Sequence, residues 1–180
     1  VFSGTVRKLT NGQWKDLGTR YGFSAGPVAS VASVTDGSGT AYVAYQDLVN
    51  NGKATVMKYE YDSWVNTGIV GFSADSALYI SIAIKNNGVP LVVYKDKGYN
   101  GRVTVKKFSN YSWRTVGLPG FSAGEVAYTS IAINNHAVPF VVYRDEANGG
   151  RATVKKFTDG NWKNVGLAGF TSTAVTNTSI

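Results

Sequence analysis

Apolar and polar residues alternate over short segments along this chain, and no segment shows the 3.6-residue periodicity of an amphipathic helix. The clearest example lies between residues 129 and 166. Segments 129–133, 139–143, 151–157 and 161–166 are rich in apolar or alternating residues, and Asn- and Gly-rich turns separate them. This pattern predicts four short strands, which we call a, b, c and d in chain order.

The four-strand pattern recurs about every 49 residues, the mark of a repeat architecture. Each unit has a Trp in strand d and a Gly-Phe pair in the loop from strand d to the next strand a. Three of the units also have a Tyr-x-Asp triplet at the end of strand b. These markers are Trp14, Trp64, Trp113 and Trp162; the pairs beginning at Gly22, Gly71, Gly120 and Gly169; and the triplets ending at Asp47, Asp96 and Asp145. Four strands per unit without helices predict an all-β fold, a β-propeller with four-stranded antiparallel blades.

The chain is expected to be a single propeller domain over residues 1–180, with units of about 1–31, 32–80, 81–129 and 130–178. Ile180 aligns with Ile131 in strand a, and Thr5 aligns with Thr153 in strand c. The register therefore predicts three complete blades and one blade split between the two ends, most simply in a four-bladed ring. The chain could equally be a fragment of a longer propeller, or copies could complete the split blade between them.

The repeated residues have expected structural roles. The small residues of strand a suit the crowded axis, the tryptophans fill the space between blades, and the Phe of each Gly-Phe pair plugs the joint. Each repeated Asp precedes a cation by six residues, which predicts ion pairs across the b–c hairpin with Lys53, Arg102 and Arg151. The alternative, a ring of carboxylates that binds Ca²⁺, is weaker because each Asp lacks a second carboxylate nearby.

The chain carries a net charge of +7 and has no cysteine, so disulfides and thiolate chemistry are excluded. No apolar run is long enough for a transmembrane helix. The positive charge recurs near the end of strand c, at Arg7, Lys8, Lys58, Lys106, Lys107, Lys155 and Lys156. Two interpretations stay open: an anionic partner such as an acidic polysaccharide or a surface, or solvated strands whose lysines prevent aggregation. No motif indicates specific nucleic-acid binding.

No set of residues suggests catalysis, so an enzyme is not expected. The single histidine, His136, lies in an a–b turn where the preceding unit has Asn87, and no orienting partner is evident. The sequence has neither a nucleophile elbow nor residues at metal-ligand spacing. We therefore expect no catalytic residue, no metal and no cofactor.

The repeat resembles the tandem blades of bacterial and archaeal secreted or cell-surface β-propellers, through Ser-Ile-Ala-Ile, Pro-x-Val-Val-Tyr-x-Asp, Thr-Val-Lys-Lys-Phe, Trp-x-x-Val-Gly and Gly-Phe-Ser-Ala. The Gly-Asn-Trp-x-x-x-Gly segment, residues 160–166, is similar to the blade ending of some propeller lectins. The Arg and Glu with which those lectins hold fucose have no repeated equivalents, so fucose binding is not carried over. The Trp-Asp, kelch and sialidase signatures are absent.

These observations favour a non-catalytic, extracellular or cell-surface module that binds glycans or mediates adhesion through several equivalent sites. The expected ligand-binding residues lie in the b–c turns: Asn50, Tyr99, Asn100 and Asn148. Asn110 and Asn177 head sequons that would accept glycans on a glycosylating secretion route. The rival hypothesis is a structural subunit that assembles into oligomers or fibres through the split blade.

Overall fold

The computed structural model describes residues 3–180, so Val1 and Phe2, with which the first predicted unit begins, lie outside the described residues. The described chain contains three four-stranded antiparallel sheets and one two-stranded sheet, which confirms the predicted propeller of three complete blades and one split blade.

The split blade contributes β1 (Arg7–Thr10) and β2 (Gln13–Asp16). Blade 1 consists of β3 (Val28–Thr35), β4 (Ala41–Asp47), β5 (Lys53–Glu60) and β6 (Ser63–Asn66). Blade 2 consists of β7 (Ala77–Ile84), β8 (Pro90–Asp96), β9 (Arg102–Ser109) and β10 (Ser112–Thr115). Blade 3 consists of β11 (Val126–Ile133), β12 (Pro139–Asp145), β13 (Arg151–Thr158) and β14 (Asn161–Asn164).

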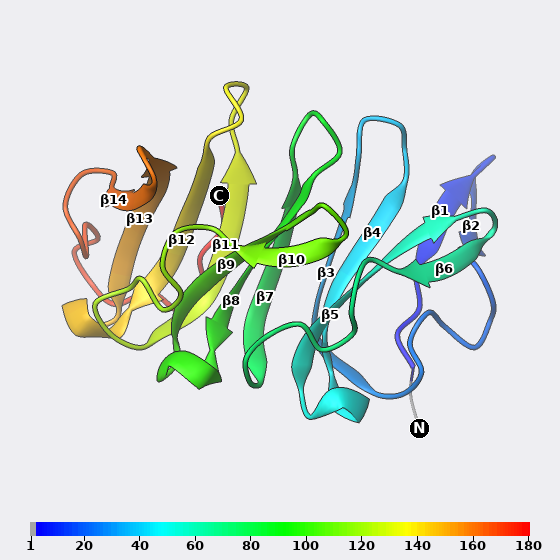
Figure 1. Cartoon of the computed structure of the whole chain (residues 1–180), viewed down its shortest axis with the longest axis horizontal. Coiled ribbons are helices and arrows are strands. Elements are labelled where there is room, and N and C mark those ends of the chain that lie inside the picture. Colours follow the sequence, from blue (N-terminus) through cyan, green and yellow to red (C-terminus); the bar gives the residue numbers. More distant parts are fainter. Residues whose placement is uncertain (1–2) are drawn as a thin grey trace.

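The b–c connections are short 3-10 helices: η1 (Leu48–Asn50), η2 (Lys97–Tyr99) and η3 (Glu146–Asn148). Each is followed by a residue in the left-handed conformation, namely Asn51, Asn100 and Gly149. Asn and Gly tolerate this conformation at little cost, which explains their abundance in these turns. The three helices lie at one end of the blades, and the a–b turns lie at the opposite end (Figure 1). We call these the b–c end and the a–b end.

Strand a contains a β-bulge that the sequence pattern did not predict. Its pairing with strand b shifts register at the same point in each complete blade, where Ser30, Tyr79 and Tyr128 have φ values of 48°, 51° and 52°. A bulge adds one residue to a strand and increases its local twist. Because pairing resumes beyond the bulge, β11 begins at Val126, three residues before the predicted start at residue 129.

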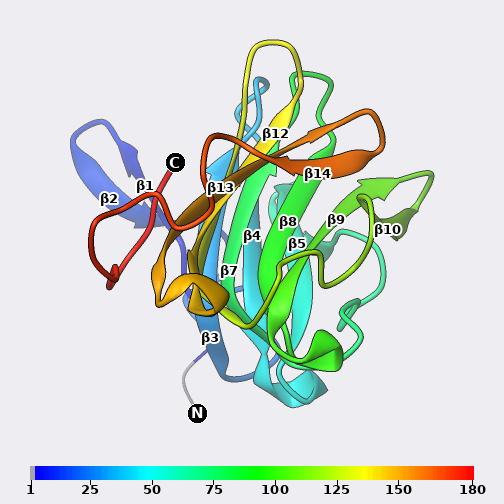
Figure 2. The ribbon, with the colours of Figure 1, turned by 90° about the vertical axis from the view of Figure 1, so that its left-hand side faces the viewer.

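The hydrophobic core is divided among the joints between blades. The sheets stand one behind another (Figure 2), so both faces of an inner blade are covered by its neighbours. In the joint between blades 1 and 2, Val56 of blade 1 packs in one cluster with Ile82 and Tyr94 of blade 2. The joint between blades 2 and 3 repeats this arrangement with Val105 and Val141. A blade's stability therefore depends on its neighbours.

The repeated aromatic residues close these joints as expected. Trp113 stacks on Phe72 with a ring-centroid separation of 4.2 Å, and Trp162 stacks on Phe121 at 4.5 Å. The indole N–H of each of these tryptophans donates to a carbonyl of the preceding blade at 2.8 Å. Trp14 belongs to the split blade and is 66% exposed, because no described strand covers its face.

The glycine of the Gly-Phe pair is required by the backbone. Gly120 has a φ of +62°, and a Cβ at this position would lie 2.9 Å from Cβ of Tyr99. Any other residue here would therefore adopt an unfavourable left-handed backbone conformation, and its side chain would clash with Tyr99. This contact fixes the d–a loop against the b–c helix of the same blade.

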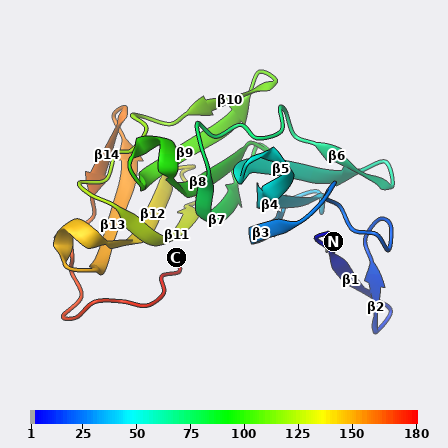
Figure 3. The same cartoon turned by 90° about the horizontal axis from the view of Figure 1, so that it is seen from below.

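The four sheets follow an open arc (Figure 3), and no sheet closes on itself. The last residues lie on the inner side of the arc, against blade 3. The backbone N–H of Ile180 donates to the Ser130 hydroxyl at 3.3 Å, as that of Ile131 donates to Ser81 at 3.3 Å. Ile180 thus occupies the strand-a position that its alignment with Ile131 predicts.

Candidate binding site between blades

The residues expected to bind ligands, Asn50, Tyr99, Asn100 and Asn148, all lie at the b–c end. Asn50 and Asn148 each close a 3-10 helix, and their side-chain amides donate to Asp47 and Asp145 at 2.8 and 2.9 Å. Asn100 has a φ of +56° and ends η2. Tyr99 is 40% exposed and presents its ring to solvent. The amides of Asn50 and Asn148 therefore help to form the turns, whereas Tyr99 and Asn100 are exposed.

The expected ion pairs of the repeated aspartates do not form. Lys53, Arg102 and Arg151 lie directly opposite Asp47, Asp96 and Asp145 in the strand register. However, the three carboxylates are buried, and none of the ion pairs among residues 3–180 involves them.

Two of these carboxylates are instead linked to a threonine on strand c, and that of Asp96 accepts from the backbone N–H of Gly98 at 3.1 Å. Thr153 donates to Asp145 at 2.8 Å and accepts from the backbone N–H of Gly169 at 2.8 Å. Thr55 makes the same pair of bonds with Asp47 and Gly71, at 3.0 and 2.9 Å. The aspartates therefore anchor the d–a loop, because a buried carboxylate needs hydrogen-bond donors more than an exposed partner charge.

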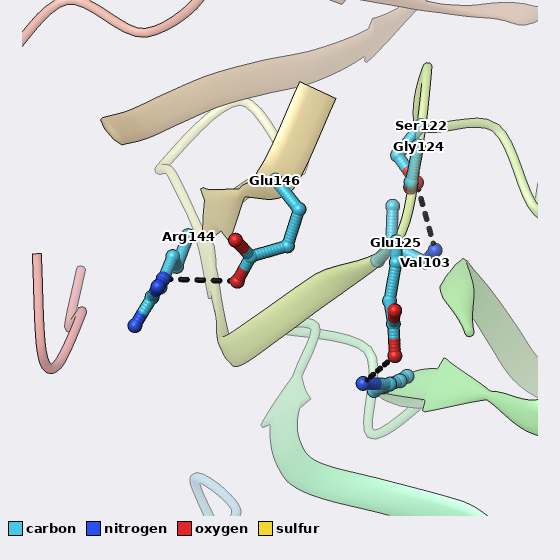
Figure 4. Close-up of polar contacts among 7 residues, drawn as sticks. Val103, Ser122, Gly124, Glu125, Arg144 and Glu146 are labelled. Atoms are coloured by element: carbon cyan, nitrogen blue, oxygen red, sulfur yellow. Dashed lines mark hydrogen bonds and ion pairs between the residues drawn. The ribbon is translucent and has the colours of Figure 1, made fainter. Parts of the chain in front are cut away.

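Other polar groups at the b–c end also have partners within the protein. Figure 4 shows Arg144 paired with Glu146 at 2.9 Å, and the Val103 N–H bonded to the Ser122 hydroxyl at 3.1 Å. The Ser122 hydroxyl in turn donates to the Gly124 carbonyl at 2.7 Å. Lys95 of blade 2 pairs with Glu125 at the start of blade 3. Many polar groups at this end are therefore bonded within the protein, but one buried carboxylate oxygen each of Asp96 and Asp145 has no hydrogen-bond partner.

A cavity of about 400 Å³ lies near the a–b end, in the joint between blades 1 and 2. Tyr42 and Lys58 of blade 1 line one side. Phe108 and Tyr111 of blade 2 line the other, and Asn66 lies at the end of β6. Tyr111 is in the β9–β10 turn and is 96% exposed, so its ring is available to a ligand. We call this cavity pocket A.

A second cavity, of about 490 Å³, occupies the equivalent joint between the split blade and blade 1. We call it pocket B. The two pockets share repeat positions: Lys8 corresponds to Lys58, and Tyr59 corresponds to Phe108. Both volumes fall in the range of small-molecule sites, which is roughly 300–1,000 Å³. The joints therefore provide related pockets rather than one isolated cleft.

Two titratable groups, Tyr42 and Lys58, line pocket A. Lys58 pairs with Glu60 at 2.7 Å, and this hydrogen bond raises the pKa of the Lys58 ammonium. Burial, with a smaller contribution from Asp36, raises the pKa of the Tyr42 hydroxyl, which therefore stays protonated at neutral pH. The pocket thus combines aromatic rings with hydroxyl, amide and ammonium groups. Such a set can stack on the apolar face of a sugar and form hydrogen bonds with its hydroxyls.

Sequence reasoning missed pocket A because its most distinctive residues are not repeated. Leu91 replaces Tyr42 at the equivalent position of blade 2, and Gly160 replaces Tyr111 in blade 3. An aromatic residue in a two-residue hairpin turn, where Gly or Asn is favoured, was the available signal.

The sequons lie at exposed positions. Asn110 is in the β9–β10 turn beside Tyr111, and Asn177 lies in the last residues of the chain. A glycan on Asn110 would stand at the mouth of pocket A. Among the described residues, no helix is long and apolar enough to cross a membrane.

Comparison with solved structures supports the fold. The structure is similar to SapL1 lectin in complex with α-methyl fucoside, with a TM-score of 0.62, 17% identity, and coverage of 93% of this chain and 57% of that one. It is also similar to an Aleuria aurantia lectin variant in complex with Fucα1-6GlcNAc, with a TM-score of 0.58, 14% identity, and coverage of 98% and 59%. A thermostable family-43 glycoside hydrolase gives a TM-score of 0.51 at 14% identity, over 76% of this chain and 50% of that one. The chain thus spans less than two thirds of each of these proteins.

No protein-family profile and no curated protein matches the sequence. At identities this low, the structural similarities show the β-propeller fold, which lectins and hydrolases share.

Proposed function

We propose that this chain is a non-catalytic, carbohydrate-binding β-propeller module whose ligands occupy the joints between blades. The observation that carries the proposal is pocket A, where Tyr42, Phe108 and Tyr111 surround a sugar-sized volume together with Asn66 and Lys58. Aromatic faces supply stacking, and the amide and ammonium groups supply orientation. The fold shared with fucose-bound lectins is consistent with this use.

The composition of the pockets supports binding rather than glycoside hydrolysis. Most glycosidases place two carboxyl groups on either side of the scissile bond, about 5–10 Å apart. None of the residues lining pockets A and B is Asp or Glu. We therefore propose that the similarity to glycoside hydrolases is limited to the fold.

The proposal includes a bacterial or archaeal origin and action outside the cell or at its surface, on the basis of the repeat pattern described above. It also includes multivalency, because pockets A and B use equivalent repeat positions. Self-assembly through the split blade remains a separate prediction. A sedimentation measurement that finds a monomer at every concentration would contradict it.

Tyr111→Ala tests the site, and Tyr61→Ala is the matched control. Both tyrosines are in c–d turns, both are more than nine tenths exposed, and both have positive φ, but Tyr111 lines pocket A whereas Tyr61 lines neither pocket A nor pocket B. On a glycan array, Tyr111→Ala is expected to weaken binding about 5- to 30-fold, the effect of one lost aromatic contact of about 1–2 kcal/mol. Tyr61→Ala is expected to bind as the unmodified chain does.

The same array separates the two ends of the molecule. Tyr99→Ala and Asn148→Ala alter the b–c end that the sequence first suggested. If these variants lose binding while Tyr111→Ala retains it, the ligand occupies the b–c end. If no glycan binds the unmodified chain, the proposed function is wrong.

A further inference from the structure

Three blades place two cations directly opposite each other on strands c and d. The cross-strand pairs are Lys8 with Lys15, Lys107 with Arg114, and Lys156 with Lys163. Like charges in this relation repel and destabilise a sheet. Because these pairs occur at one repeat position in three blades, an anion bound at this position would reduce the repulsion and stabilise each sheet.

These cations share the face of each blade that meets the following blade. Lys107 alternates with Val103 and Val105, which belong to the core between blades 2 and 3, so its side chain lies on that same face. Arg114, opposite it in an antiparallel pair, shares this face. At the equivalent positions Lys8 lines pocket B and Lys58 lines pocket A.

The other wall of each joint is aromatic. Tyr59, Phe108 and Phe157 occupy one repeat position on strand c, and each packs against the Trp of its own blade with ring centroids 5.3–5.4 Å apart. Tyr59 and Phe108 line pockets B and A. Each joint therefore has a cationic wall on one blade and an aromatic wall on the next.

Two of the cations are already neutralised. Glu60 pairs with Lys58 at 2.7 Å, and Asp159 pairs with Lys163 at 2.8 Å. Near pocket B, Asp16 is held by Arg7 at 2.8 Å. Among the described residues, Lys8, Lys15, Lys107, Arg114 and Lys156 have no ion-pair partner. The unpaired cations of these cross-strand pairs thus lie on the split blade, blade 2 and blade 3, whereas Lys58 in the joint with pocket A is paired.

We propose that the glycan bound between the blades is an anionic polysaccharide, whose carboxylate or sulfate groups contact the cationic wall while its sugar rings stack on the aromatic wall. This inference rests on the proposed function and specifies its ligand class. A cationic wall alone would fit any polyanion, but the aromatic wall favours a polymer with pyranose faces. Exposed charge pairs are weak individually, so a repeating anionic polymer gains by engaging several joints at once.

Two matched polymer pairs test the charge requirement: polygalacturonate against its methyl ester, and dextran sulfate against dextran. We expect the unmodified chain to bind the charged member of at least one pair at least about tenfold more tightly at low salt, and this preference to shrink as salt screens the charges. Binding to polygalacturonate alone would identify carboxylate as the recognised group, and binding to dextran sulfate alone would identify sulfate.

Two double variants test the location. Lys107→Gln with Arg114→Gln removes two cations from the joint between blades 2 and 3. Lys97→Gln with Arg102→Gln removes two cations from the b–c end of the same blade. We expect the first to weaken binding of the charged polymer about 3- to 20-fold and the second to change it less than about twofold. Equal losses in both variants would overturn the assignment of the site.

The outcomes separate this inference from the proposed function. If neutral and charged polymers bind equally, and binding is insensitive to salt, the module binds glycans but the ligand is not anionic. If a single-stranded oligodeoxynucleotide binds as tightly as the charged polysaccharides, the cationic wall does not select a saccharide, and the inference is wrong. If none of the polymers binds and no glycan on the array does either, the proposed function itself fails.

Discussion

At the scale of single residues, burial changes the protonation equilibria of two polar groups in blade 2. Asp96 is almost completely buried in blade 2, and burial raises the pKa of its carboxyl group. The Lys106 ammonium donates to the Phe72 carbonyl at 2.9 Å, and burial lowers its pKa. Both groups are thus shifted toward their neutral forms, the usual result of desolvation.

Asp96→Asn is expected to reveal this shift as a pH dependence of stability. Because the folded protein binds the Asp96 proton more tightly than the unfolded chain, the unfolded state carries fewer protons between the unfolded and the raised folded pKa. The stability of the unmodified chain relative to Asp96→Asn should therefore fall as pH rises from about 4, and level off above the folded pKa. Lys106, Asp75 and Tyr94 surround Asp96 and are unchanged by the substitution.

Urea unfolding of both chains between about pH 3 and pH 8 measures the difference. Asp36→Asn is the control with the opposite sign. The Ser38 hydroxyl holds the pKa of Asp36 below its usual value, so the unmodified chain should gain stability relative to Asp36→Asn as pH rises through that range. If the Asp96 and Asp36 curves have the same slope, burial does not govern Asp96.

At the scale of elements, the joint between consecutive blades is the unit of stability. Three hydrophobic clusters occupy the three joints of the described chain. In each joint, the Trp of one blade donates its indole N–H to the blade before it: Trp64 to Leu17, Trp113 to Thr67 and Trp162 to Val116. The same residue type thus contributes differently depending on whether a blade precedes it.

Trp113→Ala and Trp14→Ala compare one repeat position with and without a joint. Trp113 stacks on Phe72, so its removal is expected to cost about 3–5 kcal/mol of unfolding free energy. Trp14 is 66% exposed, so its removal is expected to change stability by less than about 1 kcal/mol. Denaturant unfolding of the two variants provides the measurement. Equal losses would show that the Trp stabilises its own hairpin rather than the joint.

The strands, the aromatic joints and the Gly-Phe turns could be predicted from sequence because each depends on a local pattern that the repeat reinforces. The β-bulge could not be predicted, because its positive-φ positions are occupied by Ser30, Tyr79 and Tyr128 and not by glycine, the residue that would have indicated a bulge. The aspartate ion pairs were predicted wrongly, because the strand register is visible in the sequence but the burial of the carboxylates is not. Pocket A was missed because it joins residues from two blades, and two of these residues vary between repeats.

At the scale of the whole molecule, the arc repeats one geometry, so a binding site at one joint implies related sites at the others. The pockets are nevertheless unequal. Pocket A has Tyr111 at its rim and pocket B does not, while pocket B has Lys8, which has no ion-pair partner among the described residues. Under the proposed function, the repeat sets the number and spacing of the pockets, and the variable positions are expected to set the affinity of each pocket.

Valency follows from this arrangement and can be measured directly. Titration calorimetry with a short saccharide should find about two sites per chain, one for each pocket, and in Tyr111→Ala one of the two sites should be weakened. On a surface coated with the same saccharide, the unmodified chain should bind about 10²- to 10⁴-fold more tightly than in solution, because the second contact is intramolecular. Tyr111→Ala should lower this gain by about the factor by which it weakens pocket A, while pocket B keeps its solution affinity. If surface and solution affinities of the unmodified chain coincide, the pockets do not act together, and binding depends on a single joint.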